Sequence, residues 1–298
     1  MTTDGPTSID GVLLRGPDPI HGALANETLD WLAKRKIPFV MLTNGGGKTE
    51  QARVEILNSK LGTNLTTDNI IQSHTPFGAL VDGPEKLRNK TILVTVPTMR
   101  PHAKSCTSWC SSPQSTAVGS ISDLSSFCSY GYRSVVTPGD IYKAEPQIFT
   151  FVKDEEKHFY DHLPPLPKPV YKNRTFNADT DFSDYLKIDA IFILNDVRDW
   201  ALDYQIISDL LVSHQGYLGT TSQKNEKHHW QQDGQPKLYF SNADLTWGAT
   251  WHMPRYGQGS TKASLQGLWR EHTKGEAGLD SYTYGKPTEL AYQYARGL

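Results

Sequence analysis

The most constraining feature of the sequence is an apolar run that ends in glycines and is followed at once by a helix-like segment. Residues 37–43 (IPFVMLT) are almost entirely apolar and stop at residues 44–47 (NGGG). A continuous apolar run of this length is typical of a strand buried on both faces of a parallel sheet. Residues 49–61 then have helical character, and Gly62 supplies a typical C-terminal cap.

The same alternation of apolar runs and helix-like segments continues along the chain. Residues 9–14 are predicted as a strand that leaves into a loop, and residues 28–36 as a helix. Further strands are predicted at 91–96, 132–137, 188–194 and 236–241, and further helices at 200–213, at 260–271 and after Pro287. Strands that alternate with helices at this spacing predict an α/β fold with a parallel sheet.

One stretch breaks this pattern. Between Ser105 and Ser129, ten of 25 residues are serine, and the stretch has little periodicity. We expect a loop or an irregular insert there. A second local feature is the spacing of Asp196, Asp199 and Asp203 near a predicted helix start, where we expect solvated acids that interact favourably with the helix dipole.

Charge and hydropathy exclude several classes of protein. The formal net charge is -2, so the balance of charges does not favour binding to nucleic acid or to an anionic membrane surface. No apolar run is long enough to cross a bilayer, and residues 1–8 resemble neither a secretory signal nor a transit peptide. We therefore expect an intracellular protein without a membrane span. Its oligomeric state is not indicated by the sequence.

Three short motifs could carry chemistry. Asp10 is an acid that is followed at once by a glycine, in residues 8–12 (SIDGV). Thr43, Asn44 and Gly45 offer a hydroxyl and unhindered backbone N–H groups that can hold a phosphate. Lys286 lies in a Gly-Lys-Pro frame, which fixes a point charge. Taken singly, the first two motifs also fit ordinary Asp-Gly and Asn-Gly turns, and the third fits a surface lysine before a helix.

A nucleotide-binding P-loop is excluded at the second motif. Residues 47–49 (GKT) resemble the end of a P-loop, but that motif needs a glycine five residues before Gly47. Leu42 occupies that position, inside the predicted strand.

Taken together and in this order, the three motifs resemble motifs one to three of the haloacid dehalogenase (HAD) superfamily. The long interval between Thr43 and Lys286 is similar to that of its class IIA branch, whose members are C2-capped and NagD-like. Longer segments resemble the cat-eye-syndrome-critical-region family of eukaryotic class IIA proteins: IDGVLLRG, IPFVMLTNGGG, IIQSHTPF, VVTPGDI, FSNADLTW, PRYGQGS and YGKPTELAY.

The resemblance implies a fold and a division of the chain. We expect a HAD-like Rossmannoid parallel-sheet core with an inserted α/β cap domain of the C2 type. The core would comprise residues 1–80 and 255–298, and the cap residues 81–254, with the irregular serine-rich insert near 97–129. Residues 1–7 are polar where the family has an apolar strand, and the family's fourth motif is expected well beyond Lys286. We therefore expect the core sheet to be incomplete.

The resemblance also implies roles for single residues. Asp10 would be the general acid and base, and its main-chain carbonyl would bind Mg²⁺. Thr43, Asn44 and Gly45 would bind phosphate. Lys286 would offset the charge of the phosphoryl group.

Two further positions complete the expected site. In class IIA proteins a cap loop similar to the one that contains Asn242 and Asp244 lies near the active site, although an ordinary Asn/Asp turn remains an alternative. Ser8 occupies the position of the family's nucleophilic aspartate. A serine hydroxyl is a poor nucleophile without a base, and it brings no charge to a metal.

Two hypotheses follow from these departures. In the first, the protein is a magnesium-dependent phosphohydrolase that acts on a small phosphorylated metabolite, mitochondrial by resemblance, and the 298-residue form is inactive because its gene model is imperfect. In the second, the chain is a genuine non-catalytic relative that binds a phosphorylated ligand or a protein partner through the cap.

Overall fold

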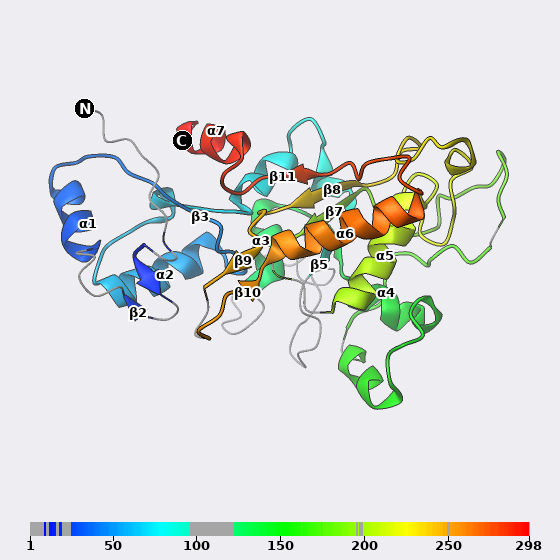
Figure 1. Ribbon diagram of the computed structural model, residues 1–298, viewed down its shortest axis with the longest axis horizontal. Coiled ribbons are helices and arrows are strands. Elements are labelled where there is room, and N and C mark those ends of the chain that lie inside the picture. The colour runs from blue at the N-terminus through cyan, green and yellow to red at the C-terminus, as the bar shows by residue number, and fades with distance from the viewer. Residues whose placement is uncertain are drawn as a thin grey trace.

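A parallel sheet, with five strands in the described part of the chain, organises the larger part of the molecule (Figure 1). Its order is β11-β8-β7-β5-β6, and each neighbouring pair is parallel. The strands are β5 (Thr91–Thr95), β6 (Ser134–Val136), β7 (Ala190–Ile193), β8 (Lys237–Phe240) and β11 (Tyr282–Thr283). The computed structural model describes residues 9, 12–15, 18–19, 25–95, 122–161, 163–173, 175–194, 196, 199–248 and 251–297.

Helices bury both faces of this sheet, which explains why its strands are apolar throughout. Every residue of β7 is buried, and alternate side chains enter different clusters. Ile191 and Ile193 pack on one face, whereas Ala190 and Phe192 pack on the other. The first face is covered by α4 (Pro138–Ala144), α5 (Trp200–Val212) and α6 (Gln258–His272), and the second by α3 (Ser122–Tyr130).

A smaller parallel pair lies beside the large sheet, at the left of Figure 1. It consists of β3 (Met41–Thr43) and β4 (Ile70–Gln72). One face packs against α2 (Glu50–Leu61), with Leu29 of α1 (Ala25–Lys34) in the same cluster. The other face packs against Ala291 of α7 (Glu289–Arg296).

Helix α2 confirms the clearest prediction from the sequence. The Thr49 hydroxyl accepts a hydrogen bond from the Ala52 N–H, which caps the first turn. Gly62 ends the helix in the left-handed region, with φ of 64°. The apolar run before it forms a shorter strand than predicted, because β3 begins only at Met41.

The strand predicted at residues 9–14 is wrong over the described residues. The Ile9 carbonyl accepts hydrogen bonds from the N–H groups of Val12, Leu13 and Leu14, which is a turn. Only the end of this range is extended: β1 (Leu14–Arg15) pairs antiparallel with β2 (Asp18–Pro19). A short apolar run does not by itself separate a buried turn from a buried strand.

The expectation of an irregular segment at residues 105–129 is wrong for its last part. Helix α3 begins at Ser122, and its Leu124 and Phe127 are buried three residues apart on one face. Serines between these side chains conceal the helical spacing in the sequence. Residues 105–121 lie outside the described residues.

The expectation of a solvated acidic helix start is also wrong for one of its three residues. Asp203 is buried, and this burial raises the pKa of its carboxyl well above the usual value. Helix α5 is apolar around most of its surface because α4 and α6 both pack against it. Asp199, at the start of the helix, accepts a hydrogen bond from the Tyr160 hydroxyl at 3.2 Å.

The remaining predicted strands and helices are present within a few residues of their predicted ends, and the α/β class with a parallel sheet is confirmed. The pairing of β11 with β8 continues the large sheet past residue 254, where the sequence predicted a return to the core. The division of the chain into core and cap stays a prediction. Within the described ranges, none of the helices combines the length and the apolar character that a bilayer crossing requires.

Candidate functional site

Loops that follow three strands meet around Asn44. The Asn44 side-chain amide donates to a carboxylate oxygen of Asp244 and to the carbonyl of Lys286, both at 2.9 Å. Its oxygen accepts from the Lys286 N–H at 2.8 Å. The Asn242 side chain donates to the Asn44 carbonyl at 3.4 Å. One asparagine thus joins the loops after β3, β8 and β11.

The topology explains this meeting. Strands β8 and β11 are parallel neighbours, so their carboxyl ends reach the same edge of the large sheet. The loop after β3 comes to that edge from the smaller sheet. Ligands of α/β proteins bind at the carboxyl ends of parallel strands, where loops from separate strands converge.

The loop after β3 is held in place by its own first residue. Thr43 is buried, and its hydroxyl accepts a hydrogen bond from the Gly45 N–H at 3.0 Å. The predicted phosphate-binding residues Thr43, Asn44 and Gly45 therefore lie in one compact segment. The chain continues from this segment to the N-terminus of α2.

The loop after β11 requires a glycine before its lysine. A Cβ atom at Gly285 would lie 2.5 Å from the Ser241 carbonyl oxygen and 2.7 Å from both the Asn242 Cβ and the Asn44 Oδ1. These atoms belong to the other two loops. The absence of a side chain at this position lets all three loops approach, and it brings the half-buried Lys286 to the meeting point.

The loop after β8 is fixed by a buried glutamine that the sequence analysis missed. Gln258, the first residue of α6, accepts from the Asn242 N–H at 2.7 Å and donates to the Ile193 carbonyl at 2.8 Å. The Asp244 N–H donates to the Asn242 side chain at 3.0 Å. The Asn/Asp turn considered as an alternative is therefore present, and the same turn carries the exposed Asp244 carboxylate to Asn44.

A second buried network lies beside the glycines of the loop after β3. A Cβ atom at Gly46 would lie 3.2 Å from the His74 ring. His74 contacts the Tyr130 hydroxyl through Nδ1 at 2.7 Å, and that hydroxyl donates to Glu50 at 2.5 Å. Since the single Tyr130 proton goes to Glu50, the His74 Nδ1 carries a proton and donates it to the tyrosine oxygen.

Burial controls the charge of this histidine. It lowers the pKa of His74 to about 4, and the nearby Glu50 carboxylate opposes the shift only in part. The imidazole is therefore neutral near pH 7. The Tyr130 contact also joins α3 to the start of α2, so it fixes the helix layer of the large sheet against the loop after β3.

Comparison with known proteins identifies the family. Residues 7–103 match the haloacid dehalogenase-like hydrolase family. A mitochondrial hydrolase of Saccharomyces cerevisiae is 35% identical over 289 residues, which cover 96% of this chain and 67% of that protein. The chain belongs to the haloacid dehalogenase-like hydrolases.

Other relatives extend the comparison of this HAD-like protein. A Schizosaccharomyces pombe protein, named as a fusion of a CMP-forming cardiolipin synthase and a mitochondrial hydrolase, is 31% identical over 296 residues. The match covers 98% of this chain and 40% of that protein, so the chain spans 67% and 40% of these two relatives.

A solved structure shows that the fold is shared. NagD from E. coli K-12 aligns with a TM-score of 0.50 and 12% identity, over 99% of this chain and 73% of NagD. The predicted membership of the HAD family is confirmed, and the resemblance to NagD is confirmed at the level of the fold. The narrower resemblance to the cat-eye-syndrome-critical-region family stays a prediction.

The structure brings most of the predicted site residues of this HAD-like chain together. Asn44, Asn242, Asp244 and Lys286 are in contact through the hydrogen bonds above, and Thr43 and Gly45 form the adjoining turn. Ser8 and Asp10 lie outside the described residues.

The described residues alone do not fit a magnesium site. Within the described ranges, histidine, cysteine, aspartate and glutamate side chains form no group of three that could hold a metal ion. Asp244 brings one carboxylate to the meeting point of the loops, where it already accepts from Asn44. Mg²⁺ prefers an octahedral set of oxygens, and Asp10, whose main-chain carbonyl the family resemblance assigns to the metal, is not among the described residues.

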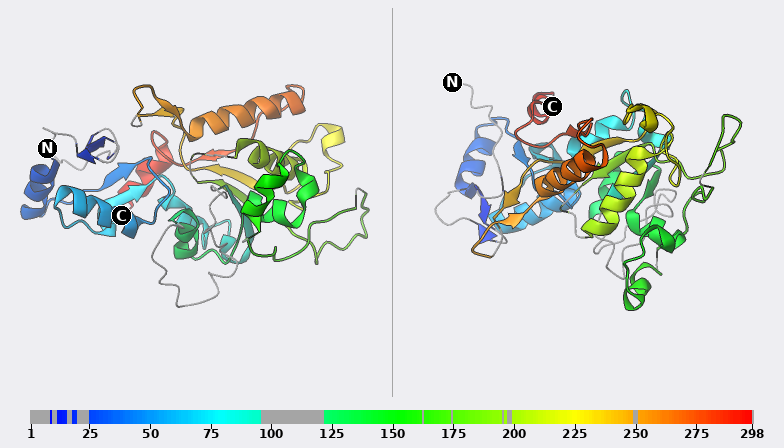
Figure 2. Two further views of the ribbon diagram at one scale, coloured as in Figure 1. Left: turned by 90° about the horizontal axis from the view of Figure 1, so that it is seen from below. Right: turned by 45° about the vertical axis from the view of Figure 1, so that its right-hand side comes forward.

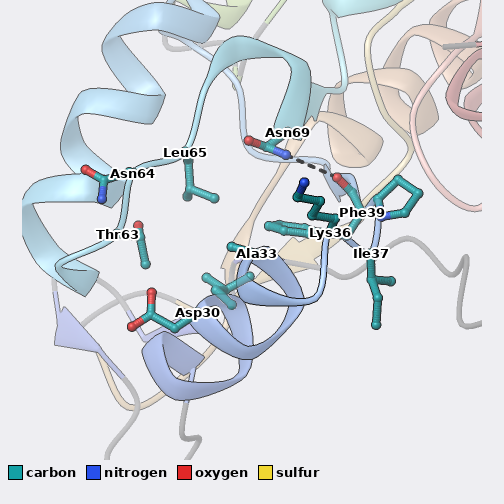
Figure 3. A pocket seen from close by; sticks show the side chains of 11 residues that line it. Asp30, Ala33, Lys36, Ile37, Phe39, Thr63, Asn64, Leu65 and Asn69 are labelled. Carbon is teal, nitrogen blue, oxygen red and sulfur yellow. Dashed lines mark hydrogen bonds between the residues drawn. The ribbon is translucent and has the colours of Figure 1, made fainter.

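A cavity of about 460 Å³ is separate from this site. Figure 3 shows side chains of α1 facing residues 63–65 across it. Asn69 closes one side by donating to the Phe39 carbonyl at 3.3 Å. Phe39 precedes β3 whereas Thr43 ends it, so this cavity lies at the opposite end of the strand from the loop after β3.

Proposed function

We propose that the site around Asn44 binds the phosphoryl group of a small phosphorylated metabolite, as expected for a phosphohydrolase of the HAD type. The observation that carries this proposal is the convergence of Asn44, Asp244 and Lys286, three residues from distant parts of the sequence, through direct hydrogen bonds. Such a meeting of a glycine-rich loop, a lysine and an exposed carboxylate suits a phosphate ester with polar groups nearby.

Each residue would have a definite task. The Thr43 hydroxyl accepts from Gly45, and a hydroxyl can accept one hydrogen bond while it donates another to a phosphoryl oxygen. The Lys286 ammonium would balance the phosphoryl charge. Asn44 would keep the loops in register, and the Asp244 carboxylate would accept a hydrogen bond from the rest of the ligand.

The residues that turnover would require are the ones at which this chain departs from the family pattern. Asp10 would act as the general acid and base, and its main-chain carbonyl would contribute to binding the Mg²⁺ that the family resemblance implies. When bound, the metal would offset phosphoryl charge. Ser8 stands where the family has its nucleophilic aspartate. We propose that this 298-residue form binds a phosphate ester without turnover.

Ser8 also favours a second candidate function. A HAD-like protein without its nucleophile would bind a phosphorylated ligand or a phosphorylated partner through the same loops and the cap, and would serve as a binding module. Both candidates use the site around Asn44, and for both we propose a mitochondrial location, which the name of the S. cerevisiae relative supports.

Parallel measurements of binding and release test the proposal. The purified chain would be titrated with small phosphomonoesters in the presence of Mg²⁺ by calorimetry, and inorganic phosphate release would be followed under the same conditions. We expect binding without release. Phosphate release by the unaltered chain that disappears in Ser8→Ala would contradict binding without turnover, and the absence of any binding would remove the proposed function itself.

A further inference from the structure

A hairpin beside the candidate site exposes an unusual concentration of apolar side chains. It is formed by β9 (Thr246–Trp247) and β10 (Arg255–Tyr256), which pair antiparallel. Of the eleven large hydrophobic side chains exposed in the described part of the chain, five lie between residues 245 and 256: Leu245, Trp247, Trp251, Met253 and Tyr256. Exposed apolar side chains that gather in one place mark a binding surface.

The base of this hairpin is continuous with the candidate site. Asp244, whose carboxylate contacts Asn44, is the residue immediately before the hairpin. Its carbonyl accepts from the Gly259 N–H, and the Leu245 carbonyl accepts from the Gly257 N–H, both at 2.9 Å. These backbone bonds hold the two ends of the hairpin together, so the hairpin has a fixed origin at the edge of the site.

The hairpin stands out from the body of the larger sheet. Figure 2 (left) shows it projecting beyond the end of α6, the helix that follows it. Trp247 lies only three residues after Asp244, and an extended chain covers roughly 10 Å in three residues. That length matches the span of a small phosphate ester whose phosphoryl group is held at the loop after β3.

One aromatic ring, that of Trp247, is held at the base of the hairpin. A Cβ atom at Gly257 would lie 3.4 Å from the Trp247 Cδ1 and 3.6 Å from an Asp196 oxygen. The Trp247 indole therefore lies over Gly257, the glycine that immediately precedes α6. The Arg255 Nε donates to the carbonyls of Met253 and Pro254, so this nitrogen of the guanidinium is hydrogen-bonded within the hairpin.

We propose that the hairpin β9–β10 binds the planar, aromatic part of a phosphomonoester whose phosphoryl group occupies the loop after β3. This inference rests on the proposed function of the site around Asn44. Tryptophan and tyrosine faces stack on flat rings and bury apolar area, whereas a polyol would need hydrogen-bond partners that the five exposed side chains supply poorly. The substrate class is thus an aryl or heteroaryl phosphate, rather than a sugar or glycerol phosphate.

The test compares three probes by calorimetry in the presence of Mg²⁺: inorganic phosphate, phenyl phosphate and glycerol 2-phosphate. The two esters have similar phosphoryl groups and differ in the leaving group. We expect phenyl phosphate to bind about tenfold more tightly than glycerol 2-phosphate, the size of a typical stacking contribution. In Trp247→Ala, this ratio should fall toward one, and Tyr256→Ala should reduce it less.

Trp31→Ala is the matched control. Trp31 and Trp247 are both 47% exposed, but Trp31 lies on α1. The control should keep the full preference for phenyl phosphate. Equal affinity for the two esters in the unaltered chain, or an unchanged ratio in both hairpin variants, would overturn the inference while inorganic phosphate binding still supported the site. Failure of all three probes to bind would overturn the inference and the proposed function together.

Discussion

The two parallel sheets in the described part of the chain differ in how they are held together. The large sheet is covered by helices on both faces, and its strands enter two extensive apolar clusters. The β3–β4 pair is small, yet it carries the loop with the proposed phosphate-binding residues. This loop reaches the large sheet through polar contacts of Asn44 and of the network of His74 and Tyr130. The difference suggests that the large sheet provides the stability, whereas polar contacts between the sheets provide the geometry of the site.

The largest expected effect of a substitution lies in the large sheet. Phe192 is fully buried on β7, with ring centroids 4.8 Å from Phe77, 4.9 Å from Tyr239 and 5.2 Å from Phe127. Phe192→Ala should lower the free energy of unfolding by about 4 kcal/mol, since it leaves a cavity among these rings. Urea denaturation measures this change. A loss below about 1 kcal/mol would mean that the large sheet does not dominate stability.

The pH dependence of stability should differ in sign between the two regions. His74 belongs to the polar network beside the loop after β3. Burial lowers the pKa of its imidazole from 6.5 to about 4. Its neutral form is favoured by the fold, so its contribution is present above pH 6.5 and is lost as the pH falls toward 4. Relative to His74→Gln, the unaltered protein should lose on the order of 2 kcal/mol between pH 7 and pH 4.

Asp140, at the start of α4 beside the large sheet, should behave in the opposite way. Burial raises its pKa from 3.8 to about 6, although Thr137 donates to the carboxylate from both its N–H and its hydroxyl. The contribution of Asp140 is therefore complete below pH 3.8 and is lost as the pH rises through 6.

Relative to Asp140→Asn, the unaltered protein should gain on the order of 2 kcal/mol between pH 7 and pH 4. Chemical denaturation of both variants at several pH values measures the two slopes. Slopes of the same sign for the His74 and Asp140 variants would break the contrast between the regions.

A substitution at Gly285 should lower stability less than Phe192→Ala does, but it should affect the site around Asn44 more. Gly285→Ala places a methyl group within 2.7 Å of atoms on both other loops, so it should cost about 2 kcal/mol and weaken phosphate binding. Gly267→Ala is the control, because a Cβ atom there meets nothing within 4 Å and alanine favours the helix. Thermal unfolding and phosphate titration of both variants decide the point; equal behaviour would contradict the close approach of the loops.

Local patterns predicted much of this structure. The run before residue 44 and the cap at Gly62 define β3 and α2 because strand burial and helix ends depend on nearby residues. The order of the motifs also located Asn44 and Lys286, and the family resemblance of the cap loop located Asp244; the structure joins all three. The family and the α/β fold are confirmed by the comparisons.

Features that depend on distant contacts were not predictable in this way. Gln258 opens α6 within a segment that looks like an ordinary polar helix start, and only its position behind the loop after β8 gives it a role. His74 and Tyr130 are far apart in the sequence and meet through packing of α3. The aromatic residues of β9 and β10 do not follow a simple periodic pattern, and their exposure became visible only in three dimensions.

The central claim is that loops after three strands form one phosphate site organised by Asn44. Its most direct test is calorimetric titration of the intact chain with inorganic phosphate in the presence of Mg²⁺, beside Asn44→Ala and the exposed control Asn64→Ala. The account predicts binding that is at least about tenfold weaker in Asn44→Ala and unchanged in Asn64→Ala, since loss of a charge-bearing hydrogen-bond network costs more than about 1.4 kcal/mol. Equal phosphate affinity in all three proteins would contradict it.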